Sequence, residues 1–190
     1  MLVQRIICYV VLAAAALVFI YSLGLVTDLH FNNFAYYAED PNYPKFEGAQ
    51  IYNEIQPFNS QLTVAGIVLI LSSVLLFAFG THSRRRYYIG NYITVALNAV
   101  LSVGVAIFGI VNVIKYREMY FQIDFEAFEM WQGILNKPNT LSTFWFDIGF
   151  YVFGFVILAT LLSLCSLAFK VYVMRGEKKL LAGSEEVTNG

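Results

Sequence analysis

Four long apolar runs divide the chain, and short polar or charged stretches separate them. The runs cover residues 6–27, 62–81, 87–114 and 144–169. Each supplies the roughly 20 residues that an α-helix needs to cross about 30 Å of hydrocarbon. Because the runs are continuous and do not alternate with polar positions, they predict membrane-spanning helices and not the strands of a barrel.

The composition supports this interpretation. Of the 190 residues, 58% are hydrophobic and 13% are charged, whereas soluble domains carry roughly 25% charged residues. The sequence therefore predicts an all-α membrane protein, a bundle of four transmembrane helices. We expect one domain over residues 1–174, with outer loops at 28–61 and 115–143 and a cytoplasmic tail at 175–190.

Basic residues are distributed unevenly between the two sides of the predicted bundle. One side holds eight: Arg5, Arg84, Arg85, Arg86, Lys170, Arg175, Lys178 and Lys179. The other holds four: Lys45, Lys115, Arg117 and Lys137. Since positive charge marks the cytoplasmic side, both termini are predicted to lie inside.

Arg84, Arg85 and Arg86 sit in the short turn between the second and third runs. We interpret them as a topology or lipid anchor, and a specific contact to a lipid headgroup or a partner remains the alternative. The turn is too short for a nucleic-acid-binding domain, so no nucleic-acid partner is expected. The first run is expected to be a retained helix, with a cleaved signal as the alternative.

The third run contains the clearest chemical pattern. Small and polar residues recur at intervals of 3, 4, 4, 7 and 3 residues, which are one or two steps of about 3.5, and so they share one side of a helix. They are Asn91, Thr94, Asn98, Ser102, Gly109 and Asn112. One interpretation is close helix packing, with the asparagines donating hydrogen bonds between helices. The other is a polar path or a small-molecule site.

Asp147 is the one ionisable residue that approaches the membrane core, near the outer end of the fourth run. An acid at this position is a functional hypothesis by default. Its position favours a shallow location, as a helix cap or as the partner of Lys115 or Arg117. Coupling to a proton or cation is the alternative.

The second outer loop predicts an amphipathic helix over residues 120–135. Its aromatic face comprises Phe121, Phe125, Phe128 and Trp131, which we expect to form an outer-face interaction surface. The two outer loops contain loosely similar segments, residues 51–62 and 130–141, in which a proline is closely followed by Asn-Ser or Asn-Thr. They indicate either a duplicated hairpin or ordinary turn and cap chemistry.

Enzyme signatures are absent from the sequence: it has no nucleophile elbow, phosphate loop or HExxH motif, and no cofactor or metal is predicted. The sequence favours a non-catalytic accessory subunit of a larger membrane assembly, with the lipid bilayer and a membrane protein or a second copy as partners. The alternatives are a small oligomeric transporter or channel that uses the third-run seam and Asp147, and a membrane-bound lipid-handling enzyme. A compact chain without sequons favours a bacterial inner membrane.

Overall fold

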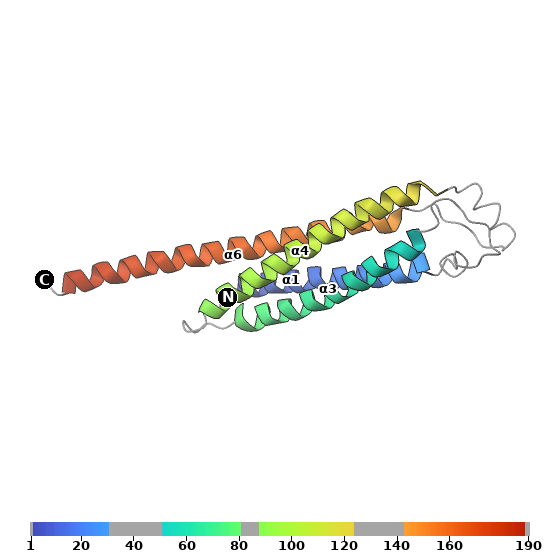
Figure 1. The fold of residues 1–190 in the computed structure, drawn as a ribbon. Coiled ribbons are helices and arrows are strands. Elements are labelled where there is room, and N and C mark those ends of the chain that lie inside the picture. Colours follow the sequence, from blue (N-terminus) through green and yellow to red (C-terminus); the bar gives the residue numbers. More distant parts are fainter. Residues whose placement is uncertain (1, 31–50, 81–87, 124–142, 189–190) are drawn as a thin grey trace, which may run out of the picture.

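The protein is all-helical in the residues that the computed structural model describes, which are 2–30, 51–80, 88–123 and 143–188. Its helices are α1 (Leu2–His30), α3 (Ile51–Gly80), α4 (Tyr88–Phe121) and α6 (Phe144–Thr188) (Figure 1). Each contains a stretch long and apolar enough to cross a membrane: Val3–Gly24, Glu54–Gly80, Asn91–Phe121 and Phe144–Gly176. The chain is therefore a multi-pass integral membrane protein, as predicted.

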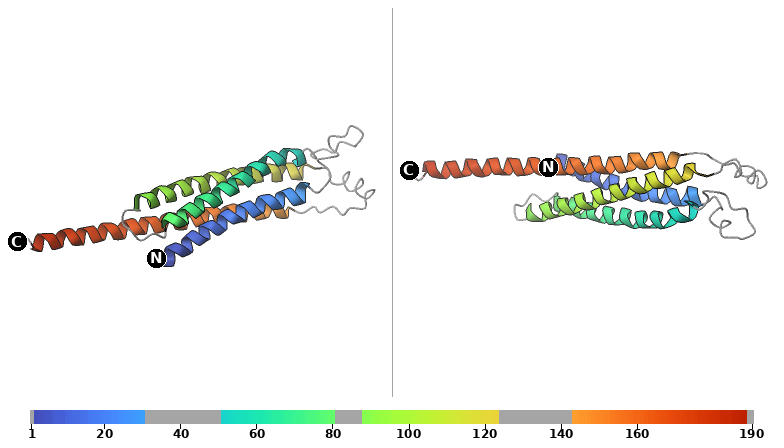
Figure 2. Two further views of the ribbon diagram at one scale, coloured as in Figure 1. Left: turned by 90° about the horizontal axis from the view of Figure 1, so that it is seen from below. Right: turned by 45° about the horizontal axis from the view of Figure 1, so that its top comes forward.

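The four helices form an antiparallel bundle in which each packs against two others. The contacts run in a ring, α1 with α3, α3 with α4, α4 with α6, and α6 with α1 (Figure 2). We call the end where α1 begins and α3 stops the near end, and the end where α1 stops and α6 begins the far end. The amino terminus lies at the near end, and α6 projects past it (Figure 1).

The bundle interior holds apolar side chains and a few small polar ones. Val18, Leu62, Ala106 and Phe153 have almost no exposed surface, and Asn98 is as well buried as they are. Many aliphatic side chains on the outside are exposed, such as Val100. Such an apolar exterior suits lipid, which provides no hydrophobic push between helices and leaves packing and hydrogen bonds to hold them together.

All four helices extend further than the apolar runs indicated, and the difference in α3 and α4 bears on the site. α3 begins at Ile51, well before residue 62, and α4 continues to Phe121, beyond residue 114. Hydropathy identifies the part of a helix that fits in hydrocarbon, and these helices continue past that part. Pro57 lies inside α3, so the Pro-Asn segment of the first outer loop does not start a helix.

The predicted amphipathic helix over residues 120–135 lies mostly outside the described residues, including Phe125, Phe128 and Trp131. Its first two residues belong to the end of α4, where Phe121 is exposed. Arg84, Arg85 and Arg86 also lie outside the described part of the chain. The tail predicted from residue 175 continues as helix to Thr188.

Candidate functional site

The polar seam predicted on the third run lies on α4. Asn91, Asn98, Ser102 and Gly109 are buried, and Thr94 and Asn112 are half-buried. The heptad-like spacing therefore brings most of the seam to the interior of this chain's own bundle. The residues then differ in what they contact.

Asn98 joins α4 to α3 in the middle of the bundle. Its Nδ2 donates to Ser72 Oγ at 2.8 Å and lies 3.3 Å from Ser73 Oγ. The two serines also donate to the carbonyl of Leu69 in their own helix. Because their protons are committed there, their oxygens are oriented to accept from the asparagine. Such neutral hydrogen bonds between helices contribute about 0.6 to 2 kcal/mol in membranes.

Gly109 allows the closest approach of α4 to α6. A Cβ built on Gly109 would overlap the ring of Phe153, which is fully buried. The same ring meets Tyr21 of α1 edge-on, with centroids 5.7 Å apart. Phe153 therefore fills the bundle centre, and the missing side chain of Gly109 makes room for it.

Thr94 and Asn112 bond within their own helix. Thr94 donates to the carbonyl of Asn91 at 3.1 Å, and Asn112 donates to the carbonyl of Phe108 at 2.8 Å. Back-bonds of this kind give a polar side chain a hydrogen-bond acceptor within its own helix.

Asn91 opens into a small polar cavity at the near end, to which all four helices contribute. The cavity has a volume of about 20 Å³, room for one water molecule. Its polar lining residues are Gln4, Cys8, Asn91, Ser163, Ser166 and Lys170. Asn91 Oδ1 is buried and has no hydrogen-bond partner among the described residues, and Lys170 Nζ donates to Gln4 Oε1 at 3.4 Å. The cavity thus offers an acceptor and one positive charge, which suits a neutral hydrogen-bonding molecule of the size of water better than a cation.

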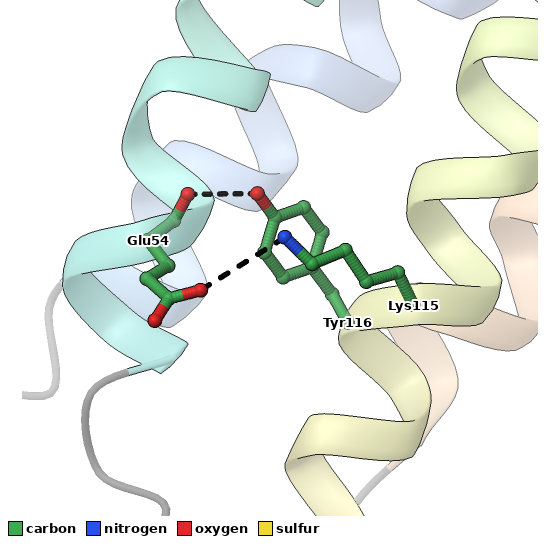
Figure 3. Close-up of polar contacts among 3 residues, drawn as sticks. All are labelled: Glu54, Lys115 and Tyr116. Atoms are coloured by element: carbon green, nitrogen blue, oxygen red, sulfur yellow. Dashed lines mark hydrogen bonds and ion pairs between the residues drawn. The ribbon is translucent and has the colours of Figure 1, made fainter.

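At the far end, polar and charged side chains of α4 contact both neighbouring helices, α3 and α6. Lys115 Nζ lies 3.9 Å from Glu54 Oε2 of α3, and the Tyr116 hydroxyl donates to the Glu54 carbonyl at 2.8 Å (Figure 3). In Figure 3 the lysine and the tyrosine approach the same turn of α3 from one turn of α4. Tyr116 also packs against Phe58, with ring centroids 5.5 Å apart.

Asp147 pairs with Arg117, one of the two partners expected from the sequence. Arg117 Nε lies 3.4 Å from Asp147 Oδ1, in an ion pair without hydrogen-bond alignment. Thr143 donates to the other carboxylate oxygen at 2.6 Å. The side chains of Arg117 and Asp147 are 40% and 46% exposed, so solvent or headgroups reach both.

The place of Asp147 in its helix indicates a shallow depth. Asp147 lies in the first turn of α6, and the apolar stretch of this helix begins at Phe144. The carboxylate therefore lies at the far end of the span, next to the membrane interface, and not in the middle of the hydrocarbon.

Several contact residues were not predicted as site residues. Glu54 falls in a stretch that the hydropathy pattern places in a loop, Ser72 is one of two adjacent serines in an apolar run, and Gln4 lies before the first run. The serine pair was a usable signal, since adjacent polar residues in a span invite a partner. Which helix faces them cannot be read from one chain.

Within the described residues, no three His, Cys, Asp or Glu side chains gather where they could hold a metal ion. Comparison with known proteins adds no further assignment: no family model, no curated protein and no solved structure matches this chain.

Proposed function

We propose that this chain is a non-catalytic accessory subunit of a larger membrane assembly, with both termini in the cytoplasm and a bacterial inner membrane as its location. The excess of basic residues on the near-end side supports this orientation. On this proposal the near end faces the cytoplasm and the far end faces outward.

The observation that carries the proposal is the length of α6. It has 45 residues, about 68 Å of helix, whereas the membrane requires about 30 Å. Lys170 still contacts Gln4 of α1. Beyond Lys170 the helix passes the near ends of α1, α3 and α4 and continues to Thr188 (Figures 1 and 2).

A helix of this kind requires a reason to stay folded. Most helix stability in proteins comes from packing, and Tyr172 and Val173 at the start of the projecting part are 77% and 41% exposed. We therefore infer that a cytoplasmic partner packs against the projecting part of α6.

Gly176 offers a matched pair of variants to test the proposal. Proline there removes a backbone donor and breaks the helix at a cost of about 3 kcal/mol. Alanine keeps it, and a Cβ at Gly176 would meet no atom within 4 Å. We expect a protein that co-purifies stoichiometrically with wild type and Gly176→Ala in mild detergent to be lost with Gly176→Pro. Equal recovery with both variants would count against the proposal.

A small oligomeric transporter or channel is the second candidate, and the near-end polar cavity favours it. A path through one chain is blocked between Asn98 and the far end, because Ala106 and Phe153 fill the centre of the bundle there and have no exposed surface. A path would have to form between copies. Flux through reconstituted vesicles that falls with Asn91→Leu, while the fold is kept, would favour this candidate over the first.

A further inference from the structure

An open apolar groove runs along the outside of the bundle between α1 and α6, in the half nearer the far end. Its volume is about 510 Å³, within the range of sites that hold small molecules. Leu17, Ile20 and Gly24 form the α1 wall, and Trp145, Ile148 and Val152 form the α6 wall.

The groove owes its shape to two contacts between a glycine and an aromatic ring. A Cβ on Gly24 would lie 2.5 Å from Cζ3 of Trp145, so the indole lies directly against the α1 backbone. A Cβ on Gly149 would lie 2.6 Å from the Tyr21 hydroxyl oxygen. Tyr21 thus directs its hydroxyl towards Gly149, and its buried ring lies at the base of the groove. The surface offered to an occupant is almost entirely hydrocarbon.

The length of the groove selects the kind of occupant. Leu17 to Gly24 on α1 and Trp145 to Val152 on α6 each extend over about 10 Å of helix. That is less than half of the roughly 30 Å hydrocarbon core, so the groove lies within one leaflet. A transmembrane helix of a partner or a second copy would pack along the whole span. A flexible chain from one leaflet fits the short groove instead.

Among the described residues, no side chain occupies the space of the groove. The groove lies between two membrane spans and opens to the bilayer through exposed side chains, among them Ile20 at 59%. An empty groove would forfeit the dispersion contacts of its walls, and lipid hydrocarbon surrounds it on the open side. Water is a poor occupant, because an apolar lining offers it no hydrogen bonds.

We propose that this α1–α6 groove is a lipid site that holds one acyl chain of a phospholipid from the leaflet at the far end. Trp145 packs against this chain near the membrane interface, where tryptophan is favoured. The lipid fills the space between α1 and α6 and stays with the protein when bulk lipid is removed.

Two isoleucines provide matched variants. Ile20 lies in the groove and is 59% exposed, and Ile107 lies on the outside of α4, away from the groove, and is 57% exposed. Ile20→Phe narrows the groove, whereas Ile107→Phe makes the same change on an ordinary lipid-facing surface. Both side chains face outward, so we expect both variants to fold. Should Ile20→Phe fail to fold, Val152→Phe narrows the groove from the other wall.

The experiment is native mass spectrometry of the full chain, purified from phosphatidylcholine vesicles into mild detergent. We expect one retained lipid per chain in wild type and Ile107→Phe. Retention should fall about tenfold in Ile20→Phe, equivalent to about 1.4 kcal/mol of binding free energy. Equal retention in all three, or none in wild type, overturns the proposal. A dimer that Ile20→Phe abolishes also overturns it, because the groove would then be an interface between copies.

Fluorescence gives an independent readout, because the chain has two tryptophans and Trp131→Phe leaves Trp145 alone. Lipids brominated along the acyl chain should quench Trp145 strongly in this background. Adding Ile20→Phe should reduce the quenching, and adding Ile107→Phe should leave it unchanged. Quenching that is insensitive to Ile20→Phe would mean that Trp145 meets bulk lipid only, and the assignment would fail.

Discussion

At Asn98, α4 meets α3 through neutral side chains that are shielded from lipid and water. At Lys115 and Arg117, the same helix meets α3 and α6 through charges that are about half exposed. The difference follows depth in the membrane. A charge in the hydrocarbon would be costly, so the middle of the bundle uses hydrogen bonds and close packing. The far end lies near water, where ion pairs form easily and contribute little.

The comparison predicts that substitutions in the middle of α4 destabilise the bundle more than substitutions at its far end. All four expectations below refer to the free energy of unfolding, measured by titration with a denaturing detergent. They are ordered from the largest expected effect to the smallest.

Gly109→Ala should be the most damaging change. Its Cβ would overlap the buried ring of Phe153, and overpacking of this kind costs about 1–3 kcal/mol. Phe153→Leu in the same chain should recover part of the loss. Gly104→Ala is the matched control, because a Cβ there meets no atom within 4 Å. Equal effects of the two alanines would contradict the proposed close contact of α4 with α6.

Asn98→Ala should cost about 0.6 to 2 kcal/mol, since it removes the hydrogen bonds to Ser72 and Ser73. Asn112→Ala should cost less, because Asn112 bonds only within its own helix among the contacts described. A double-mutant cycle of Asn98→Ala with Ser72→Ala isolates the pair. A coupling energy of zero would mean that the hydrogen bond between Asn98 and Ser72 does not stabilise the contact of α3 with α4.

Tyr116→Phe removes a single hydroxyl and keeps the ring against Phe58. We expect a loss of about 0.5–1.5 kcal/mol, the usual net value of one hydrogen bond. Glu54→Gln is an informative companion, because the tyrosine donates to the backbone carbonyl of Glu54 and not to its carboxylate. The loss caused by Tyr116→Phe should therefore be the same in the Glu54→Gln background.

Asp147→Asn should have the smallest effect, below about 1 kcal/mol, because both partners of the ion pair are partly exposed. The effect should shrink further in high salt, which screens exposed charges. Arg117→Gln should behave alike, and the two together should cost little more than either alone. A loss of several kcal/mol would place Asp147 deeper in the membrane than its surroundings indicate.

The four spans could be predicted from the sequence because a membrane-spanning helix must be long enough to cross the hydrocarbon and must be apolar, and both properties can be read from a run of residues. The sequence also predicted which side of α4 carries Asn91, Asn98 and Gly109, because helical periodicity is a local property. It did not predict that Asn98 faces Ser72 or that Gly24 lies under Trp145. Those contacts depend on how helices far apart in the chain are arranged around one another. Glu54 was assigned to a loop because the first turns of α3, which contain it, are less hydrophobic than the rest of the helix.

The hydrogen bond of Asn98 joins two helices that are also consecutive in synthesis. α3 leaves the ribosome immediately before α4, so its serines are already available when the asparagine-bearing segment follows. Partition of α4 alone into lipid would expose three asparagines. If the two helices enter the membrane as a pair, Asn98 can form its hydrogen bond with Ser72 immediately. We therefore expect membrane insertion to depend on the order of the segments, so that a circular permutant that separates α3 from α4 inserts less efficiently.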